Sequence, residues 1–413
     1  MDDRSFRRQS LAIEEEKPSG RAARPKGVDP SCTGVAVQIL QAGCNEARQL
    51  GDMTDLLDDL VRRGVSVWLD DLDRTALLDG TLERLIRCRH VSGVTTNPVI
   101  FARSITGSAA YDAQLNELRL RGASGDEARR ALTARDVRTA CDLLRPPFDE
   151  GGDGLVSIEV DPRFAYDADA TLADARALWW QVDRPNLLIK IPATKASLPA
   201  IGACLAEGIS VNVTLIFSAE RYAEVFDTFV EGMTRAAESG RDLRRIVSVA
   251  SLFVSRVDTA VDNLLRPTQR FAELRGRAAL ANARRAAEIF ARRIQEPGWL
   301  ELRAAGARPQ RLLWASTGVK DLAYDATRYV TGLAIPGTIN TMPMATLEAV
   351  AKQTTAASST TWLDAATELK ALTDAGIELD RVMAQLETDG VEAFVEAWAA
   401  LGATIAHRLA ARP

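Results

Sequence analysis

From residue 53 onward, short apolar runs rich in β-branched residues alternate with longer segments whose apolar residues recur every three to four positions. The short runs predict β-strands, and the longer segments predict amphipathic helices. We expect eight strands, at 65–69, 91–95, 154–160, 186–191, 209–214, 246–251, 311–316 and 334–340. We expect helices at 81–89, 126–144, 171–181, 196–206, 219–239 and 274–294, and two long helical stretches at 343–373 and 377–410.

This regular alternation of strands and helices predicts a parallel sheet. The run Leu187-Leu188-Ile189 is continuously apolar, as expected for a strand that is covered by helices. Eight strand–helix units close naturally into a single (β/α)8 barrel of the TIM type, with extra helices. A doubly wound open sheet is the alternative. It is weaker because no strand leads into a glycine-rich nucleotide-binding turn.

Residues 1–52 have a different character. They contain Pro18, Pro25, Pro30 and the acidic run Glu14-Glu15-Glu16, and no period of 3.6 or 2 begins before Val35. Transit peptides are poor in acidic residues, which argues against that interpretation. We therefore expect a disordered N-terminal extension over 1–52, followed by the barrel over 53–413.

Composition excludes several classes of function. The chain has 413 residues, 51 Lys and Arg against 56 Asp and Glu, two His, and 46% hydrophobic residues. This supports a large core, and the net charge of −5 argues against a nucleic-acid-binding surface. No apolar run reaches the roughly 18 residues of a membrane span. Two histidines argue against His-based zinc sites and Ser-His-Asp triads. Five dispersed cysteines without a C-x-x-C pair favour a reducing compartment, so we expect a cytoplasmic protein.

Polar residues gather at the ends of the expected strands. In a barrel of this type the active site lies at the carboxyl ends of the strands. The candidates, in chain order, are Asp70, Thr95, Asn97, Glu159, Lys190, Asn212, Thr214, Ser251, Arg256, Ser316 and Lys320.

Lys190 is the most informative of these residues. It is one of only seven lysines, and it shares a strand face with Leu188 and Pro192. Both faces of a barrel strand are dry, and a buried lysine is rare unless it is paired or functional. Desolvation lowers the pKa of an ammonium group, and a neutral amine can attack a carbonyl to form a Schiff base. The structural alternatives are an ion pair with a strand carboxylate such as Glu159, or a lysine at the strand end whose amine extends to solvent.

The carboxylates also have two interpretations each. Glu159 lies in an apolar strand and needs a partner. It either pairs with Lys190 or carries protons through a water molecule, which Thr214 could orient. Asp70 either takes a proton from a substrate hydroxyl as a C–C bond breaks, or caps the helix that follows.

The sequence also predicts an anion site, formed by Arg256, Ser316 and Lys320. Loops after the seventh and eighth strands of barrels often bind phosphate. Ser316 begins a small-residue turn, Lys320 follows it, and Arg256 offers a forked donor. The alternative for Arg256 is a salt bridge to Asp258 or Asp262 on its own helix.

Taken together, these segments resemble the transaldolase family of class I Schiff-base aldolases, in the long form common in actinobacteria. The resemblance covers residues 53–400, and its blocks are specific as an ordered set. They are 66–71 (SVWLDD), 93–98 (GVTTNP), 157–162 (SIEVDP), 189–194 (IKIPAT), 211–218 (VNVTLIFS), 249–258 (VASLFVSRVD) and 313–321 (LWASTGVKD).

The resemblance implies transfer of a dihydroxyacetone unit from sedoheptulose 7-phosphate to glyceraldehyde 3-phosphate in the non-oxidative pentose phosphate pathway. It implies sugar phosphates as partners, no metal or organic cofactor, and no nucleic acid or membrane. By position, Lys190 carries the Schiff base, Asp70 is the acid/base, and Glu159 and Thr214 handle water. Thr95, Asn97, Asn212 and Ser251 would hold the donor, and Arg256 and Ser316 the phosphate.

One departure affects the phosphate site, and three questions stay open. Gly318 stands where many family members have an arginine, and Lys320 is a candidate replacement for that charge. Cleavage of the fructose-6-phosphate aldolase type, or a catalytically silent sugar-phosphate-binding barrel, are the alternative functions. The protein is a monomer or a homodimer, and the segment around Trp398 either packs in the core or forms a dimer surface.

Overall fold

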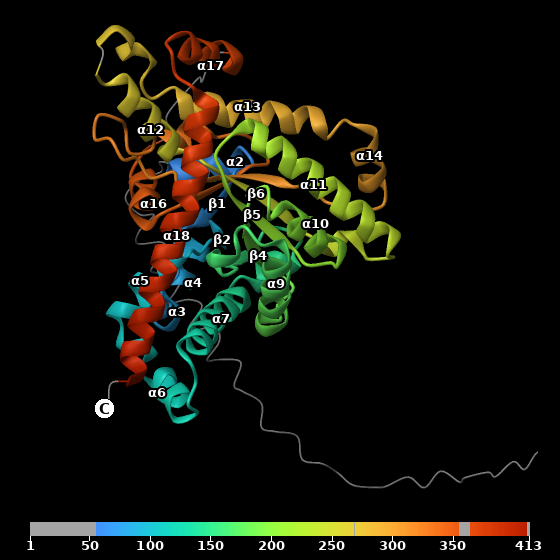
Figure 1. Cartoon of the computed structure of the whole chain (residues 1–413), viewed down its shortest axis with the longest axis vertical. Helices are drawn as coiled ribbons and strands as arrows, with labels where there is room; N and C mark the ends of the chain where they lie inside the picture. Colours follow the sequence, from blue (N-terminus) through green and yellow to red (C-terminus); the bar gives the residue numbers. More distant parts are fainter. Residues whose placement is uncertain (1–54, 268, 355–363, 411–413) are drawn as a thin grey trace, which may run out of the picture. The chain divides into compact units, whose positions relative to one another are not determined.

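The computed structural model describes residues 55–267, 269–354 and 364–410 (Figure 1). The expected disorder of residues 1–52 lies outside this range. All of the described residues belong to one compact unit. The boundary between an N-terminal extension and the barrel stays a prediction.

Eight parallel strands form a closed barrel in the order β1 to β8, and β8 pairs with β1. The predicted (β/α)8 barrel is therefore confirmed, and the doubly wound alternative is wrong. The strands are β1 (Ser66–Leu69), β2 (Val91–Val94), β3 (Leu155–Glu159), β4 (Leu187–Pro192), β5 (Val211–Ile216), β6 (Ser248–Phe253), β7 (Arg311–Ala315) and β8 (Ile339–Met342).

Three strands begin two or more residues later than the sequence predicts. β5 and β6 are displaced by two residues toward the C-terminus, and β8 begins five residues after the expected start at 334. The delay in β8 has a local cause. Gly337 has a φ of 81° and donates its backbone N–H to the carbonyl of Gly64, so the chain turns there before pairing begins.

The helices surround the barrel, and the predicted ones are present with changes at their ends. Before β5 they are α2 (Leu56–Arg62), α3 (Arg74–Leu78), α4 (Thr81–Cys88), α5 (Pro98–Gly107), α6 (Asp112–Leu120), α7 (Gly125–Leu143), α8 (Arg145–Asp149), α9 (Ala168–Val182) and α10 (Leu198–Ala206). After β5 they are α11 (Ala219–Glu238), α12 (Ser255–Leu265), α13 (Ala278–Arg293), α14 (Pro297–Ala304), α15 (Arg328–Thr331), α16 (Met344–Ala351), α17 (Ala365–Asp374) and α18 (Leu379–Ala410). The stretch expected at 343–373 contains α16 and most of α17, and its middle lies outside the described residues.

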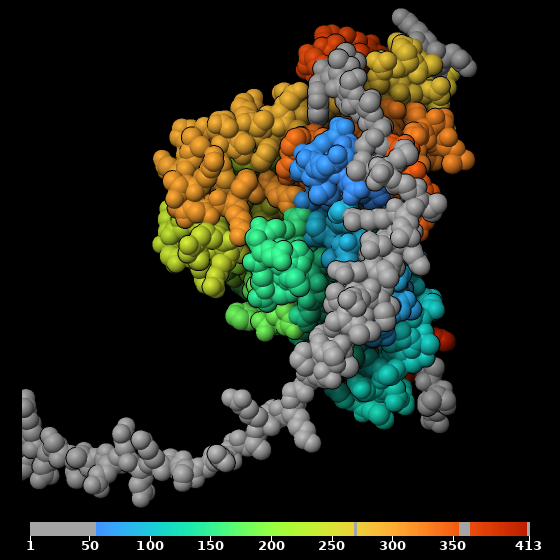
Figure 2. Space-filling view, turned by 180° about the vertical axis from the view of Figure 1, so that it is seen from behind, coloured from blue at the N-terminus to red at the C-terminus, as the bar shows by residue number. Residues whose placement is uncertain are grey.

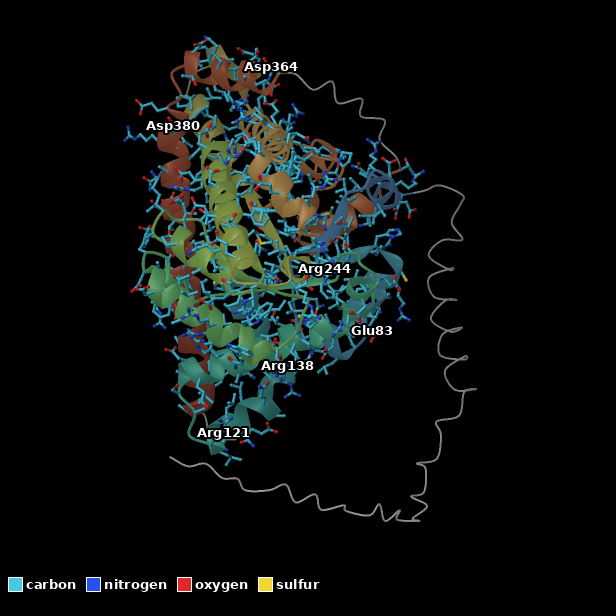
Figure 3. The ribbon with its side chains drawn as sticks, turned by 90° about the vertical axis from the view of Figure 1, so that its right-hand side faces the viewer. Glu83, Arg121, Arg138, Arg244, Asp364 and Asp380 are labelled. Atoms are coloured by element: carbon cyan, nitrogen blue, oxygen red, sulfur yellow. The ribbon has the colours of Figure 1, made fainter. Side chains whose placement is uncertain are left out.

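Helix α18 is the longest element, with 32 residues. It contacts α5, α6, α7, α12 and β5 (Figure 1). Asp380 near its start and Arg121 beside α6 mark the two ends of its path (Figure 3). Trp398 is 7% exposed and its ring lies under the guanidinium of Arg129, which also donates to the Trp398 carbonyl. Trp398 therefore packs within the chain, as the core-packing alternative predicted.

Another side of the barrel is covered by other helices. There α2 (blue) and the orange segment that contains α13 and α14 reach the surface (Figure 2). Within the described residues, no helix is long and apolar enough to cross a membrane. The same residues contain no cluster of three or more His, Cys, Asp or Glu that could hold a metal ion.

Candidate active site

Three adjacent strands bring chemically reactive side chains to one level of the barrel. In the strand register Glu159 on β3 lies opposite Lys190 on β4, and Lys190 lies opposite Asn212 on β5. Residues that are opposite each other in neighbouring strands project from the same face. All three side chains are buried. The structure therefore brings together three of the predicted site residues.

The amine of Lys190 lies inside the barrel, since the residue is only 4% exposed. Its Nζ donates a hydrogen bond of 2.8 Å to the carbonyl of Thr96 and lies 3.8 Å from Oε1 of Glu159. The ring centroid of Phe394 on α18 lies 5.8 Å from the same nitrogen. The amine thus has both polar groups and an aromatic ring near it.

Glu159 is poorly satisfied by its surroundings. Neither carboxylate oxygen has a hydrogen-bond partner among the described residues, although both are buried. Burial raises the pKa of Glu159 to about 7, while the nearby Lys190 opposes that rise. Thr214 Oγ1 on β5 is also buried, and it too has no hydrogen-bond partner among the described residues. Buried polar groups of this kind are usually bound to water or ligand.

The backbone beside Thr214 is irregular. Leu215 has a φ of 58°, which is unusual for a residue that is not glycine, and the register with β6 shifts between Val213 and Ile216. A bulge of this kind redirects side chains and is typical of strand ends near active sites. The β5 strand is therefore distorted next to Thr214, the residue predicted to orient a water molecule.

Asp70 lies at the carboxyl end of β1. Its Oδ1 accepts a hydrogen bond of 2.7 Å from Thr95 Oγ1, which lies 2.7 Å from Thr341 Oγ1 on β8. Burial raises the pKa of Asp70, and the charge of Lys190 opposes the rise. Asp70 is not a helix cap, because Asp73 caps α3 by accepting from the backbone of Thr75. The capping alternative for Asp70 is wrong.

The predicted amides have different surroundings. Asn97 Oδ1 caps α5 by accepting from the backbone N–H of Ile100. Asn212 is fully buried, donates to Ser157 Oγ at 2.9 Å and accepts from Ser251 Oγ at 2.6 Å. Ser157 and Ser251 therefore fix the orientation of the Asn212 amide beside Lys190.

Ser316 contacts Ser255 at the start of α12, and Arg256 is the next residue of that helix. Ser316 has a φ of 55°, and its hydroxyl lies 3.0 Å from that of Ser255, the residue before Arg256. Burial lowers the pKa of Arg256, and Asp389 on α18 opposes this effect. The Arg256 guanidinium lies 5.5 Å from the ring centroid of Phe253 at the end of β6. It forms no salt bridge with the described residues.

The two carboxylates that were alternative partners for Arg256 are bound elsewhere. Asp258 accepts from Tyr329 and Asp262 accepts from Tyr324, at 2.9 and 2.6 Å, and each also accepts from a backbone N–H near α13. The alternative of a salt bridge to either one is therefore wrong.

Lys320 lies in the loop after β7. It is exposed and lines a cavity of about 170 Å³ together with Asp262. Neither Arg256 nor Ser316 lines that cavity. The lining of this cavity therefore gives no support for a shared anion site.

Three residues at the site carry no distinctive signal in the sequence. Ser157 is one more small residue in a strand, and Thr341 is one of several polar residues near the end of β8. Phe394 lies in a helix more than 200 residues after Lys190 in the chain. Their proximity to Asn212, Thr95 and Lys190 depends on tertiary packing, and hydrophobic periodicity alone could not reveal it.

Comparison with known proteins identifies the family of this chain. The sequence model of the family described as Transaldolase/Fructose-6-phosphate aldolase matches residues 67–405. A protein of Acidothermus cellulolyticus named transaldolase is 54% identical over 363 residues, covering 86% of this chain and 98% of the relative. A transaldolase of Thermobifida fusca is 53% identical, with the same coverage of both chains. One of a Parafrankia species is 50% identical and is covered over 99% of its length. The chain therefore belongs to the transaldolase/fructose-6-phosphate aldolase family.

Proposed function

We propose that this protein is a transaldolase that moves a dihydroxyacetone unit from sedoheptulose 7-phosphate to glyceraldehyde 3-phosphate. Erythrose 4-phosphate and fructose 6-phosphate are the products. The observation that carries the proposal is the buried Lys190 amine, 3.8 Å from Glu159 and close enough to Asp70 to oppose the rise of its pKa. Family membership and relatives named transaldolase support the same conclusion.

The first step is formation of a Schiff base. The Lys190 amine attacks the ketone carbon of the donor, and loss of water gives an iminium ion. Thr214 orients this water molecule, and Glu159 transfers protons to and from it. A carboxyl group with a pKa of about 7 can give and take protons near neutral pH, which suits a step that runs in both directions.

The second step is C–C cleavage. Asp70 takes the proton of the C4 hydroxyl, the C3–C4 bond breaks, and the electron pair flows into the iminium ion to give an enamine. Erythrose 4-phosphate leaves as the aldehyde. Thr95, hydrogen-bonded to Asp70, holds the carboxylate in place. The enamine carbon then attacks the aldehyde of the acceptor, Asp70 returns the proton, and hydrolysis releases fructose 6-phosphate.

The remaining side chains bind the substrates. We assign the donor hydroxyls to Asn97, Asn212 and Ser251, and the phosphate to Arg256 and Ser316. Arg256 suits this role because it is a cation with no salt bridge to the described residues. Lys320 stays a candidate for the phosphate site, and it is exposed. No organic cofactor is needed for these steps. We expect the reaction to take place in the cytoplasm.

Replacement of the lysine tests the proposal directly. We expect Lys190→Ala to lose production of erythrose 4-phosphate in a coupled assay and to keep the wild-type melting temperature within a few degrees. Lys195→Ala is the matched control, because Lys195 is exposed and lies five residues later in the chain. It should keep full activity.

Chemical trapping supplies an independent measurement. Borohydride added with fructose 6-phosphate should reduce the Schiff base and leave a mass adduct on the peptide that contains Lys190. An adduct on another lysine would defeat the assignment. Release of free dihydroxyacetone without an acceptor, at the rate of transfer, would favour the aldolase alternative. Ligand binding without turnover would favour a silent barrel.

A further inference from the structure

The C-terminal helix brings an aromatic side chain to the candidate Schiff-base lysine. Phe394 on α18 is 3% exposed, and its ring centroid lies 5.8 Å from Lys190 Nζ. Gly390 lies one helical turn earlier. A Cβ at that position would lie 3.1 Å from the side chain of Leu215 and 3.3 Å from the ring of Phe217. Helix α18 therefore packs closely against the carboxyl end of β5, beside Thr214.

The Lys190 amine has two kinds of neighbour. The polar ones are the Thr96 carbonyl and the carboxylate of Glu159, whose oxygens can bind a water molecule. The apolar one is the Phe394 ring, which neither donates nor accepts an ordinary hydrogen bond. The geometry thus permits water near Glu159 and excludes it from the volume that the ring occupies.

The apolar neighbour matters because the enamine has two fates. Its nucleophilic carbon can attack an aldehyde, which forms a C–C bond and completes the transfer. Alternatively, that carbon can take a proton from water, which leaves hydroxide and turns the enamine back into an iminium ion. Hydroxide or water then adds to the iminium carbon to give a carbinolamine, the C–N bond breaks as the nitrogen takes the hydroxyl proton, and free dihydroxyacetone and the lysine amine are released, with one water consumed overall. A site that excludes water from the enamine favours the first fate.

We infer that Phe394 is a specificity-determining residue that favours transfer over release by keeping water away from the enamine on Lys190. The inference rests on the proposed transaldolase function. In this inference the aldehyde acceptor and water compete for the enamine carbon. Helix α18 thereby has a role in the outcome of the reaction, in addition to its packing against α5 and α7.

The test measures two rates for each variant. One is erythrose 4-phosphate production with the acceptor present, and the other is free dihydroxyacetone released from fructose 6-phosphate without acceptor. For Phe394→Ala the ratio of release to transfer should rise about tenfold, which corresponds to ~1.4 kcal/mol between competing barriers. Phe394→Leu keeps most of the apolar volume, and the ratio should rise less. This variant decides the question if Phe394→Ala fails to fold.

Leu401→Ala is the matched control. Leu401 is fully buried on the same helix, seven residues or about 10 Å further along, so its truncation weakens packing of α18 without changing the wall beside Lys190. Its ratio should stay at the wild-type value. The inference is overturned if both rates fall in parallel in the Phe394 variants, or if Leu401→Ala shifts the ratio as much as Phe394→Ala does. Absence of transfer or of a borohydride adduct in the wild type would instead refute the proposed function.

Discussion

Glu159 and Asp70 are both in a position where burial disfavours their charged forms. Burial raises the pKa of each carboxyl group, and in each case the charge of Lys190 is the largest opposing influence. A group that serves as a proton carrier near neutral pH needs a pKa close to that pH. The same buried environment that makes these residues costly for stability therefore makes them suitable for proton transfer.

The raised pKa of Glu159 predicts how stability depends on pH. Between its ordinary value of 4.5 and the folded value of about 7, the folded protein holds a proton that the unfolded chain has released. The tighter binding of this proton in the folded state adds to the free energy of unfolding. That added free energy is fully present below pH 4.5 and is lost as the pH rises through 7. Replacement by Gln removes the titrating group. The melting temperature of Glu159→Gln relative to wild type should therefore increase from about pH 5 to about pH 8.

The measurement is a thermal melt of both proteins across that pH range. Ser251→Ala is a suitable control, since it changes a buried hydrogen bond at the same site and introduces no titrating group. Its difference from wild type should vary less with pH. A melting-temperature difference between Glu159→Gln and wild type that stays constant across the range would refute this explanation.

Some residues of the site were predictable from the sequence and others were not. Lys190 and Glu159 interrupt apolar strands, and such interruptions need an explanation even in a single sequence. Lys320 follows Ser316 closely in the chain and lines a cavity that Ser316 does not line. The path of the loop after β7 depends on tertiary contacts, so closeness in sequence alone does not establish a shared anion site.

At the scale of elements, the neighbouring strand β1 restricts which residue can stand at position 93 of β2. Gly93 pairs with Trp68, and a Cβ at Gly93 would lie 2.4–2.6 Å from three atoms of the Trp68 indole. Trp68 cannot easily move, because it is fully buried and its Nε1 donates to Asp153. A glycine is therefore required at this position by packing, since its φ is not in the left-handed region.

Gly93→Ala should consequently destabilise the barrel by about 1–3 kcal/mol, the usual cost of overpacking a core. Denaturant unfolding measures this as a lower midpoint with an unchanged slope. Gly298→Ala in α14 is the matched control, because nothing lies within 4 Å of the point that its Cβ would occupy. Alanine is favoured over glycine in a helix, so that variant should be neutral or slightly more stable. Equal effects at both positions would contradict the packing explanation.

The order of the strands and most of the long helices could be predicted, because each strand is a short apolar run and these helices have a clear period. The ends were less predictable. The run 334–338 contains Ala334 and Ile335 and looks like the start of a strand, yet the turn at Gly337 delays β8 to Ile339. Likewise, Gly276 with a φ of 70° lies before α13 and shortens the helix expected from 274. In both places a backbone turn overrides the side-chain pattern.

At the scale of the whole barrel, the two ends of the strands have different tasks. The carboxyl ends hold Lys190, Asp70 and the groups around them. The amino ends are joined by a polar cluster around Arg311 and Asp153, which form a salt bridge. Arg311 also donates to Ser66 Oγ at 2.6 Å and to the Gly337 carbonyl at 3.1 Å. This cluster connects β1, β7 and the segments before β3 and β8, so it helps to close the barrel.

Removal of the arginine should therefore weaken folding and leave catalysis intact. Arg311→Met leaves the carboxylate of Asp153, which is 7% exposed, without its main partner. We expect a loss of about 2–4 kcal/mol in urea unfolding, because an uncompensated buried charge is costly. The turnover number of the folded variant at room temperature should stay within about twofold of wild type, since barrels of this kind place catalysis at the opposite end of the strands. The double variant Arg311→Met/Asp153→Asn removes the stranded charge and should recover part of the lost stability. A turnover number that falls in proportion to stability while the protein remains folded would contradict this explanation. It would show that the cluster at the amino ends of the strands also affects catalysis.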